Sequence, residues 1–211
     1  MARSRIQTLR RQQIIEAARR SIVEHGLEEV GVRDIAEAAG MSPGSITYYY
    51  PALDDLLQQV QDEATSRFST VRWRTIEALD DPRAQLVALC EGGIATGPDD
   101  ELYALLYEFT GLARREPTYR MLWKTQYDRQ VPLYQSVLAT GAGVGLFRLV
   151  APAATIAHHL VALEDSLAFH VLTGVSFDRD AAIGMMLSYA NVATGCELRR
   201  STAAGALPAA P

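Results

Sequence analysis

The residues best suited to molecular recognition lie in one short segment, between Val32 and Tyr49. Four side chains at its end carry hydroxyl groups, and they belong to Ser45, Thr47, Tyr48 and Tyr49. Hydroxyls on one exposed helical surface can donate to and accept from base edges and phosphate oxygens. The alternative is an ordinary helical hairpin that carries an exposed aromatic cluster. The completeness of the surrounding pattern favours recognition of nucleic acid.

Two short helices are predicted to position these hydroxyl groups. One spans residues 32–39, and the next begins at Pro43, where a missing N–H costs nothing, with Ser42 as its cap. Gly40 between them permits the positive φ of a tight turn. The two helices are expected to bury a small shared core, made of Ile35, Ala39, Met41 and Ile46. Such a helix-turn-helix can place the start of its second helix in the major groove of DNA.

The charge distribution also favours a nucleic-acid partner. The chain has a formal net charge of −5, but its first twenty residues hold six arginines against Glu16 alone. A basic N-terminal segment on an acidic body is typical of a protein whose one end meets phosphate. A solvated, arginine-rich helix start is the competing interpretation of the same charges. We expect the arm from Arg3 to Arg11 to add phosphate or minor-groove contacts.

Two groups of aromatic residues further along the chain resemble the wall of a ligand pocket. Tyr103 and Tyr107 share a predicted helical face with Arg114. The following helix carries Tyr119, Trp123, Tyr127 and Tyr134 at near-helical spacing. Aromatic walls with a few polar groups suit a small-molecule pocket, but the same stripes are equally typical of a core. We assign Tyr103, Tyr107, Trp123, Tyr127 and Tyr134 to a candidate ligand site and leave the core alternative open.

Catalytic and metal chemistry find less support. No Gly-rich phosphate loop follows a strand, and the sequence has no G-x-S-x-G or H-E-x-x-H pattern, so we expect no enzyme and no cofactor. A cluster of possible metal ligands falls on different sides of one predicted helix, without partners from a second segment. Its members are His158, His159, Glu164, Asp165 and His170. Cys90 and Cys196 lie far apart in apolar stretches typical of a core, so no metal site is expected.

The fold class is predicted to be all-α, because no segment shows the alternation of a strand bounded by turns. A helix over 7–25 should bury Ile14, Ile15, Ala18 and Ile22. Further helices are predicted over 53–79, 83–96, 101–115, 117–139, 153–173 and 178–199. Pro132 should kink or split its helix, and residues 141–145 should form a loop. We expect a three-helix DNA-binding domain over 1–52, a helical domain over 53–200, and a disordered tail over 201–211.

The last two predicted helices each carry an apolar stripe. Leu160, Leu163, Leu167 and Val171 form the first, and Ala182, Met185, Met186, Tyr189 and Val192 form the second. One chain cannot easily cover both stripes, so we expect two copies to pack as a four-helix bundle through residues 153–199. The sequence has no stretch of eighteen apolar residues and no signal-peptide core, which predicts a soluble, cytoplasmic protein without a membrane partner.

The run IIEAARRSIVEHGLEEVGVRDIAEAAGMSPGSITYYYPALDDLL resembles the DNA-binding domain of the TetR family of bacterial transcriptional repressors. Residues 151–199, and above all LEDSLAFHVLTG, are more weakly similar to the last two helices of that family. The resemblance implies a homodimer that occupies a palindromic operator and is released by a small hydrophobic or aromatic inducer. It also implies base and phosphate contacts at particular positions, which are Arg33, Ser42, Pro43, Gly44, Ser45, Thr47, Tyr48 and Tyr49.

Three positions depart from the family pattern. Thr47 stands where a tyrosine is common, which predicts a change in the operator that is read. Leu53 stands where a lysine usually touches phosphate, so that contact is lost. Gly31 replaces the usual Ser or Thr cap, although glycine is tolerated as a cap. A helical adaptor that binds only protein is a further alternative, but it would need neither the basic arm nor a recognition helix. Activation, or repression without a ligand, also stays open.

Overall fold

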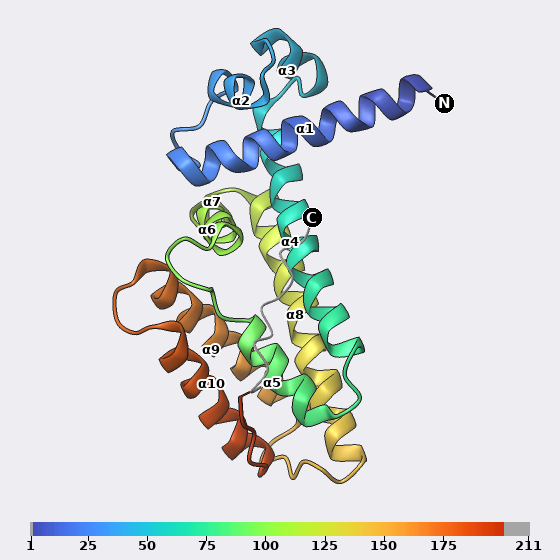
Figure 1. Cartoon of the computed structure of the whole chain (residues 1–211), viewed down its shortest axis with the longest axis vertical. Coiled ribbons are helices and arrows are strands. Elements are labelled where there is room, and N and C mark those ends of the chain that lie inside the picture. Colours follow the sequence, from blue (N-terminus) through green and yellow to red (C-terminus); the bar gives the residue numbers. More distant parts are fainter. Residues whose placement is uncertain (1, 201–211) are drawn as a thin grey trace. The chain divides into compact units, whose positions relative to one another are not determined.

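The computed structural model describes residues 2–200, and side chains from residue 5 onward; the expected tail over 201–211 lies outside the described residues. Within that range every regular element is an α-helix, which confirms the predicted all-α class (Figure 1). The helices are α1 (Ala2–His25), α2 (Val32–Ala39), α3 (Pro43–Tyr49), α4 (Leu53–Glu77), α5 (Pro82–Gly92), α6 (Glu101–Glu108), α7 (Thr110–Arg115), α8 (Pro117–Gly143), α9 (Ala153–Thr173) and α10 (Arg179–Thr194). None of the described helices is both long enough and apolar enough to cross a bilayer.

The helices pack into two compact units. The first unit comprises the chain up to Arg67 together with Ala104–Trp123, and the second comprises Phe68–Tyr103 together with the chain from Lys124 onward. The helices α4 and α8 each contribute residues to both units. The division between these packing units is set by tertiary contacts, and it does not coincide with the boundary expected at residue 52 between the DNA-binding domain and the rest of the chain.

The core of the first unit is built by the buried face of α1. Ile14, Ile15, Ala18 and Ile22 are all buried there, as their helical spacing predicted. α1 packs against α2, and α2 packs against α3. Figure 1 shows α2 and α3 together on one side of α1, so the short helices rest on the long one.

The core of the second unit overturns part of the dimer argument. Leu160, Leu167 and Val171 of α9 are buried inside the chain itself, where α9 packs against α10. Ala182 and Met186 of α10 are fully buried in the same way. One chain therefore covers most of the α9 stripe but only part of the α10 stripe. The apolar surface left on these two helices includes Met185 and Val192 of the predicted α10 stripe, together with Phe169 of α9.

Several predicted helix boundaries are wrong for local reasons. The helix expected over 101–115 is divided into α6 and α7 at Phe109. α8 is not split by Pro132, and it continues to Gly143 through most of the predicted 141–145 loop. Gly141 is required there, because a Cβ at this position would lie 2.2 Å from the Phe147 ring. α10 ends at Thr194, before the predicted residue 199, because Gly195 takes a left-handed φ of 59°.

Candidate functional site

α1 fixes the position of the helix-turn-helix through two side-chain contacts. Gln13 Nε2 donates to the backbone carbonyl of Ala39 at 2.9 Å, and Arg20 donates to the carbonyl of Ala38 at 3.0 Å. Both acceptors lie at the end of α2, where helix carbonyls lack intrahelical partners. These contacts hold the C-terminal end of α2 against α1.

The turn between α2 and α3 has the geometry that its glycine predicted. Gly40 adopts a φ of 64° and ψ of 36°, and its N–H donates to Glu37 O at 3.0 Å. The N–H of Met41 donates to Ala36 O at 2.9 Å, which completes the paired bonds that close a helix with a left-handed residue. A side chain at position 40 would strain this conformation, so glycine fixes the sharp exit from α2.

The start of α2 is capped from within the helix. Gly31, which replaces the usual hydroxyl cap, has no side chain to offer. The Asp34 carboxylate instead accepts the Gly31 N–H at 2.8 Å. Its negative charge also lies in the first turn, where the helix dipole favours it. The departure at Gly31 therefore leaves α2 intact.

α3 begins at the predicted cap. Ser42 Oγ accepts the Ser45 N–H at 3.2 Å, and the two serine hydroxyls lie 2.8 Å apart in a hydrogen bond. Pro43 occupies the first helical position. Ile46 is 1% exposed, so it anchors the buried face of α3. The opposite face is consequently presented to solvent.

The hydroxyl-bearing residues of α3 differ in how freely they can bind a partner. Tyr48 is 72% exposed, and its ring meets the Tyr49 ring edge-to-face at a centroid distance of 5.2 Å. Thr47 is exposed, and its hydroxyl donates back to the carbonyls of Pro43 and Gly44 at 3.3 and 3.2 Å. A solvent-facing hydroxyl bonded to its own helix can exchange that bond for one to a ligand at little cost.

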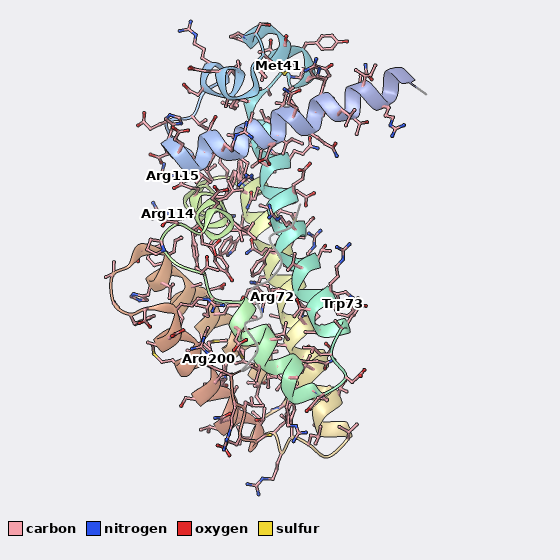
Figure 2. All side chains as sticks on the ribbon, viewed as in Figure 1. Met41, Arg72, Trp73, Arg114, Arg115 and Arg200 are labelled. Carbon is pink, nitrogen blue, oxygen red and sulfur yellow. The ribbon has the colours of Figure 1, made fainter. Side chains whose placement is uncertain are left out.

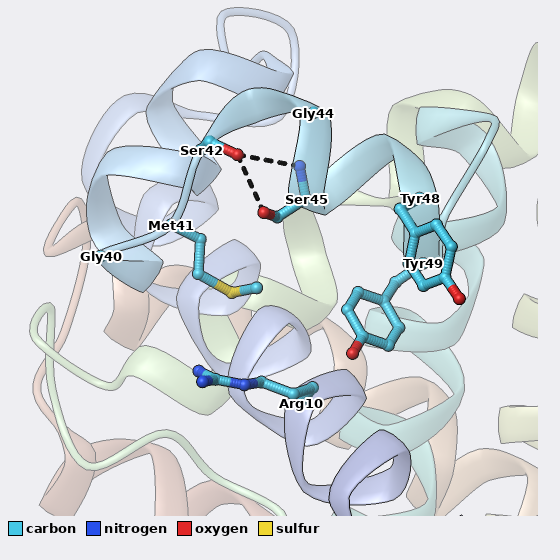
Figure 3. Close-up of a pocket in the computed structure, with 8 residues that line it drawn as sticks. All are labelled: Arg10, Gly40, Met41, Ser42, Gly44, Ser45, Tyr48 and Tyr49. Atoms are coloured by element: carbon cyan, nitrogen blue, oxygen red, sulfur yellow. Dashed lines mark hydrogen bonds between the residues drawn. The ribbon is translucent and has the colours of Figure 1, made fainter. Parts of the chain in front are cut away.

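A hollow of about 610 Å³ lies beside this face of α3 (Figure 3). Figure 3 shows Arg10 of α1 on the other side of the hollow from the Ser42–Ser45 pair. Its lining residues are Arg10, Gly40, Met41, Ser42, Gly44, Ser45, Tyr48 and Tyr49. One cation, several hydroxyls and exposed ring edges thus surround a single concave surface. Such a surface can hold a phosphate or a base edge.

The structure brings five of the eight predicted contact residues to this hollow, namely Ser42, Gly44, Ser45, Tyr48 and Tyr49. Pro43 and Thr47 lie on the same exposed helix but do not line it, and Arg33 is exposed at the start of α2. Arg10 and Met41 line it without having been assigned as contacts. The signal for Arg10 was its place in the basic arm. Met41 was interpreted only as core, yet it is incompletely buried because it lies in the turn itself (Figure 2).

The five candidate ligand-site aromatics are divided between the two units. Tyr107 and Trp123 belong to the first unit, and Tyr103, Tyr127 and Tyr134 to the second. Tyr134 is fully buried and Tyr103 nearly so, whereas the other three are partly exposed. Tyr127 lies against His158, with its hydroxyl 2.8 Å from His158 Nδ1 and the two rings stacked at 5.7 Å.

Tyr134 belongs to a buried polar cluster in the second unit. Its hydroxyl donates to Glu164 Oε2 at 2.5 Å, and Glu164 is paired with Arg72 of α4. Burial raises the pKa of Tyr134 well above its ordinary value, and the charge of Glu164 raises it further. Burial likewise raises the pKa of the Cys90 thiol to about 12, which keeps this cysteine protonated. No local pattern in the sequence indicates that Arg72 belongs to this cluster.

The histidines and carboxylates of α9 are engaged separately. His159 Nδ1 lies 2.7 Å from the Tyr189 hydroxyl, and His158 pairs with Tyr127 as described. In the part of the chain that the structure describes, no three His, Cys, Asp or Glu side chains converge as metal ligands would. The contacts of these histidines are with tyrosines.

Comparison with known proteins identifies the scaffold that carries this geometry. Residues 14–60 match the family of bacterial regulatory proteins called the tetR family, and residues 82–193 match the C-terminal domain of BetI-type transcriptional repressors. The chain is 28% identical over 167 residues to the transcriptional regulator PksA of Bacillus subtilis, covering 77% of this chain and 78% of that protein. It is 36% identical over 99 residues to BetI 2 of Chromohalobacter salexigens, covering 44% and 48%.

Solved structures agree in fold. A TetR regulator from Haloarcula marismortui superposes with a TM-score of 0.80 at 21% identity, covering 89% of this chain and 99% of the other. A putative regulator from Saccharomonospora viridis in complex with choline gives 0.78 at 26% identity, covering 85% and 94%. The family is one of transcriptional regulators and not of enzymes. With the helix-turn-helix geometry and both parts of the chain matched, the protein belongs to the TetR family of transcriptional regulators.

Proposed function

We propose that this regulator binds a palindromic operator as a homodimer, represses transcription there, and is released by a small hydrophobic or aromatic inducer. The observation that carries the proposal is the solvent-facing surface of α3, where a capped recognition helix and Arg10 border one hollow. A capped helix with an anchored apolar face is rigid enough to present hydroxyls to base edges in the major groove.

The proposed DNA contacts are of two kinds: contacts to phosphate, which position the protein, and contacts to bases, which recognise the sequence. Arg10 and Arg33 are exposed cations on α1 and α2, and they suit phosphate oxygens. The Ser42–Ser45 hydroxyl pair lies at the start of α3, where backbone N–H groups also favour phosphate. Tyr48, the most exposed of the α3 hydroxyl residues, suits a base edge or the thymine methyl. Thr47 reads from a shorter side chain than the tyrosine it replaces.

The homodimer is proposed to use the faces of α9 and α10 that the chain itself leaves uncovered. Phe169 is 48% exposed, Met185 42% and Val192 69%. Small exposed residues flank them, including Ala162 and Ser166 on α9, so helices of a second copy can approach closely. Dimerisation would remove these apolar side chains from water, which is favourable. Two recognition helices would then meet two half-sites of a palindrome.

Within the first unit, two buried or half-buried hydrogen bonds connect the DNA-binding helices to later helices. Glu108 of α6 accepts the Leu27 N–H at 2.9 Å in the turn after α1. The hydroxyl of Tyr119 on α8 donates to Asp54 at the start of α4 at 2.6 Å. We propose that inducer binding shifts these helices and so alters the placement of α3. Reciprocal effects of inducer and operator on each other's affinity then follow.

The inducer is proposed to contact the partly exposed Tyr127 of the second unit, whose hydroxyl lies 2.8 Å from His158 Nδ1. If Tyr127 lines the site, Tyr127→Ala keeps its fold and its operator affinity but loses release by the inducer. If it is core, the same change lowers the melting temperature markedly, since deleting a buried aromatic costs about 3–5 kcal/mol. A thermal melt paired with operator release by an inducer found in a library of aromatic compounds separates the two.

The proposed function is tested by selecting binding sequences from a random double-stranded library with the purified full chain. The expected result is a palindromic consensus bound by two copies, with mass measured on the complex. Charge-driven binding without a consensus would contradict an operator-specific regulator. A single bound copy on a non-palindromic site would contradict the homodimer.

A further inference from the structure

Arg72 places a full positive charge inside the second unit. Arg72 is 3% exposed, and its guanidinium pairs with both carboxylate oxygens of Glu164. Its Nη2 donates to Glu164 Oε2 at 2.8 Å. The same guanidinium also donates to the backbone carbonyl of Leu89 at 3.1 Å. The charge and both terminal nitrogens of Arg72 are thereby satisfied, whereas its Nε has no hydrogen-bond partner. A buried cation is tolerated only when its charge is paired in this way.

Two aromatic rings complete the surroundings of this cation. The central carbon of the guanidinium lies 5.0 Å from the centroid of the Phe68 ring and 5.3 Å from that of Tyr134. Both distances are within the range of a cation–π contact, which strengthens when water is excluded. Aromatic faces are the groups with which proteins bind organic cations such as quaternary ammonium groups, and a carboxylate adds the opposite charge.

Glu164, Phe68 and Tyr134 surround the guanidinium of Arg72 and are called the box below. Glu164 and Tyr134 are held in place by contacts that do not involve Arg72. Gln130 Nε2 donates to Glu164 Oε1 at 3.1 Å, and the Tyr134 hydroxyl donates to Oε2 at 2.5 Å. A Cβ at Gly93 would lie 2.2 Å from Glu164, so glycine makes room for the carboxylate. The carboxylate of Glu164 and the Tyr134 ring are therefore positioned by α8, α9 and the residue after α5, whereas Arg72 and Phe68 both come from α4.

The electrostatics agree with a site built for positive charge. Burial lowers the pKa of Arg72, but the charge and hydrogen bond of Glu164, together with the nearby Tyr134 and Tyr103, outweigh this effect and raise the pKa above its usual range. Burial and the charge of Glu164 also keep Tyr134 neutral, so its hydroxyl donates. The box therefore carries one negative charge for the cation that fills it.

We propose that Phe68, Tyr134 and Glu164 form a binding site for a small organic cation, and that the guanidinium of Arg72 is its tethered occupant. Arg72 thereby closes the site to soluble quaternary ammonium and guanidinium compounds in the natural chain. Arg72 therefore determines which ligands can enter the site. When its side chain is shortened, the box is free to bind a monovalent organic cation. The proposal deepens the ligand-responsive function proposed above, but its test uses no DNA.

The test is calorimetric titration of full-length Arg72→Ala with tetramethylammonium chloride and, separately, with methylguanidinium chloride. Both cations should bind at least about tenfold more tightly than to the natural chain, because they replace a desolvated cation–π and ion-pair partner. Urea, which is neutral and similar in shape to guanidinium, should not bind. Adding Glu164→Gln to Arg72→Ala should abolish binding of both cations. Arg74→Ala, which removes an exposed arginine of the same helix, is the matched control and should behave as the natural chain.

Three results would overturn the proposal. If tetramethylammonium bound the natural chain as tightly as Arg72→Ala, Arg72 would not block the site. Absence of binding to a folded Arg72→Ala would show that there is no receptor. Binding of methylguanidinium alone would assign the cluster to an ordinary hydrogen-bonded ion pair, because tetramethylammonium cannot donate hydrogen bonds.

Loss of a buried partner can also unfold the variant, so helicity is followed by circular dichroism in each salt. If Arg72→Ala is unfolded in sodium chloride, recovery of its helical signal in tetramethylammonium chloride at the same ionic strength supports the site. Recovery in neither salt overturns it. Because no operator is involved, failure here leaves the DNA-binding proposal untouched, and failure of operator selection leaves this one untouched.

Discussion

The surface of α3 and the Arg72 cluster use polar groups in opposite ways. On α3, Tyr48 projects into solvent and Thr47 bonds only to its own helix. In the cluster, Arg72 and Glu164 are almost fully buried, and their charges are paired with each other. A polar group that water satisfies can be transferred to a ligand, whereas a buried one must keep its partner. The first region is therefore expected to govern binding and the second to govern stability.

Breaking the buried pair should have the largest effect on stability. Glu164→Gln leaves the Arg72 charge without its counter-ion in the interior, which costs about 3–5 kcal/mol. Urea unfolding followed by circular dichroism measures it. Asp128→Asn is the matched control, since it breaks only the exposed pair with Lys124 and should change stability by less than about 0.5 kcal/mol. Equal losses in the two variants would contradict the assigned difference between buried and exposed pairs.

The dimer face should be separable from the core. Phe169→Glu puts a charge on an exposed residue of α9, so it should yield folded monomers. Sedimentation and a thermal melt together measure the outcome. Leu167→Arg, by contrast, buries a charge inside the chain and should unfold it. Val144→Glu, which is exposed outside these helices, is the control and should stay dimeric. A dimeric Phe169→Glu protein would place the interface elsewhere.

Asp165 adds a pH dependence to the buried region. Burial and, after it, the charge of Glu164 together raise the pKa of Asp165 from an ordinary 3.8 to about 7. The folded state then holds a proton that the unfolded state has lost, so stability is full below about pH 4 and falls as the pH rises through 7. When the pH is raised from 5.5 to 8, the free energy of unfolding should fall less for Asp165→Asn than for the natural chain. Identical losses in urea midpoints would show that Asp165 does not titrate in this range.

Removing one exposed cation should have the smallest effect. Arg10→Ala should weaken binding to all DNA sequences similarly, and lower the slope of log affinity against log salt by about one. Fluorescence anisotropy at four salt concentrations measures the slope, with Arg74→Ala as control. An unchanged slope for Arg10→Ala would remove this residue from the phosphate contacts.

The sequence predicted the recognition helix because its signals are local. Gly40, Ser42 and Pro43 each fix a turn or a helix end through bonds to near neighbours, and the structure shows those bonds. The pairing of Arg72 with Glu164 joins residues 92 positions apart, so no local pattern indicates it. The prediction of a dimer interface is wrong for most of the α9 stripe, and for Ala182 and Met186 of α10, for a related reason. Periodicity shows that a helix has an apolar face, but not whether its own chain or a second copy covers that face.

The most direct test of the central claim compares operator binding and folding in one variant of α3. Tyr48→Ala removes an exposed ring from the proposed interface, and Trp73→Ala removes an exposed ring from α4 as the control. Tyr48→Ala should weaken operator binding by about 1–3 kcal/mol, which is roughly 5- to 150-fold, while its melting temperature stays that of the natural chain. Trp73→Ala should bind normally. An unchanged operator affinity for Tyr48→Ala would contradict recognition by this face of α3.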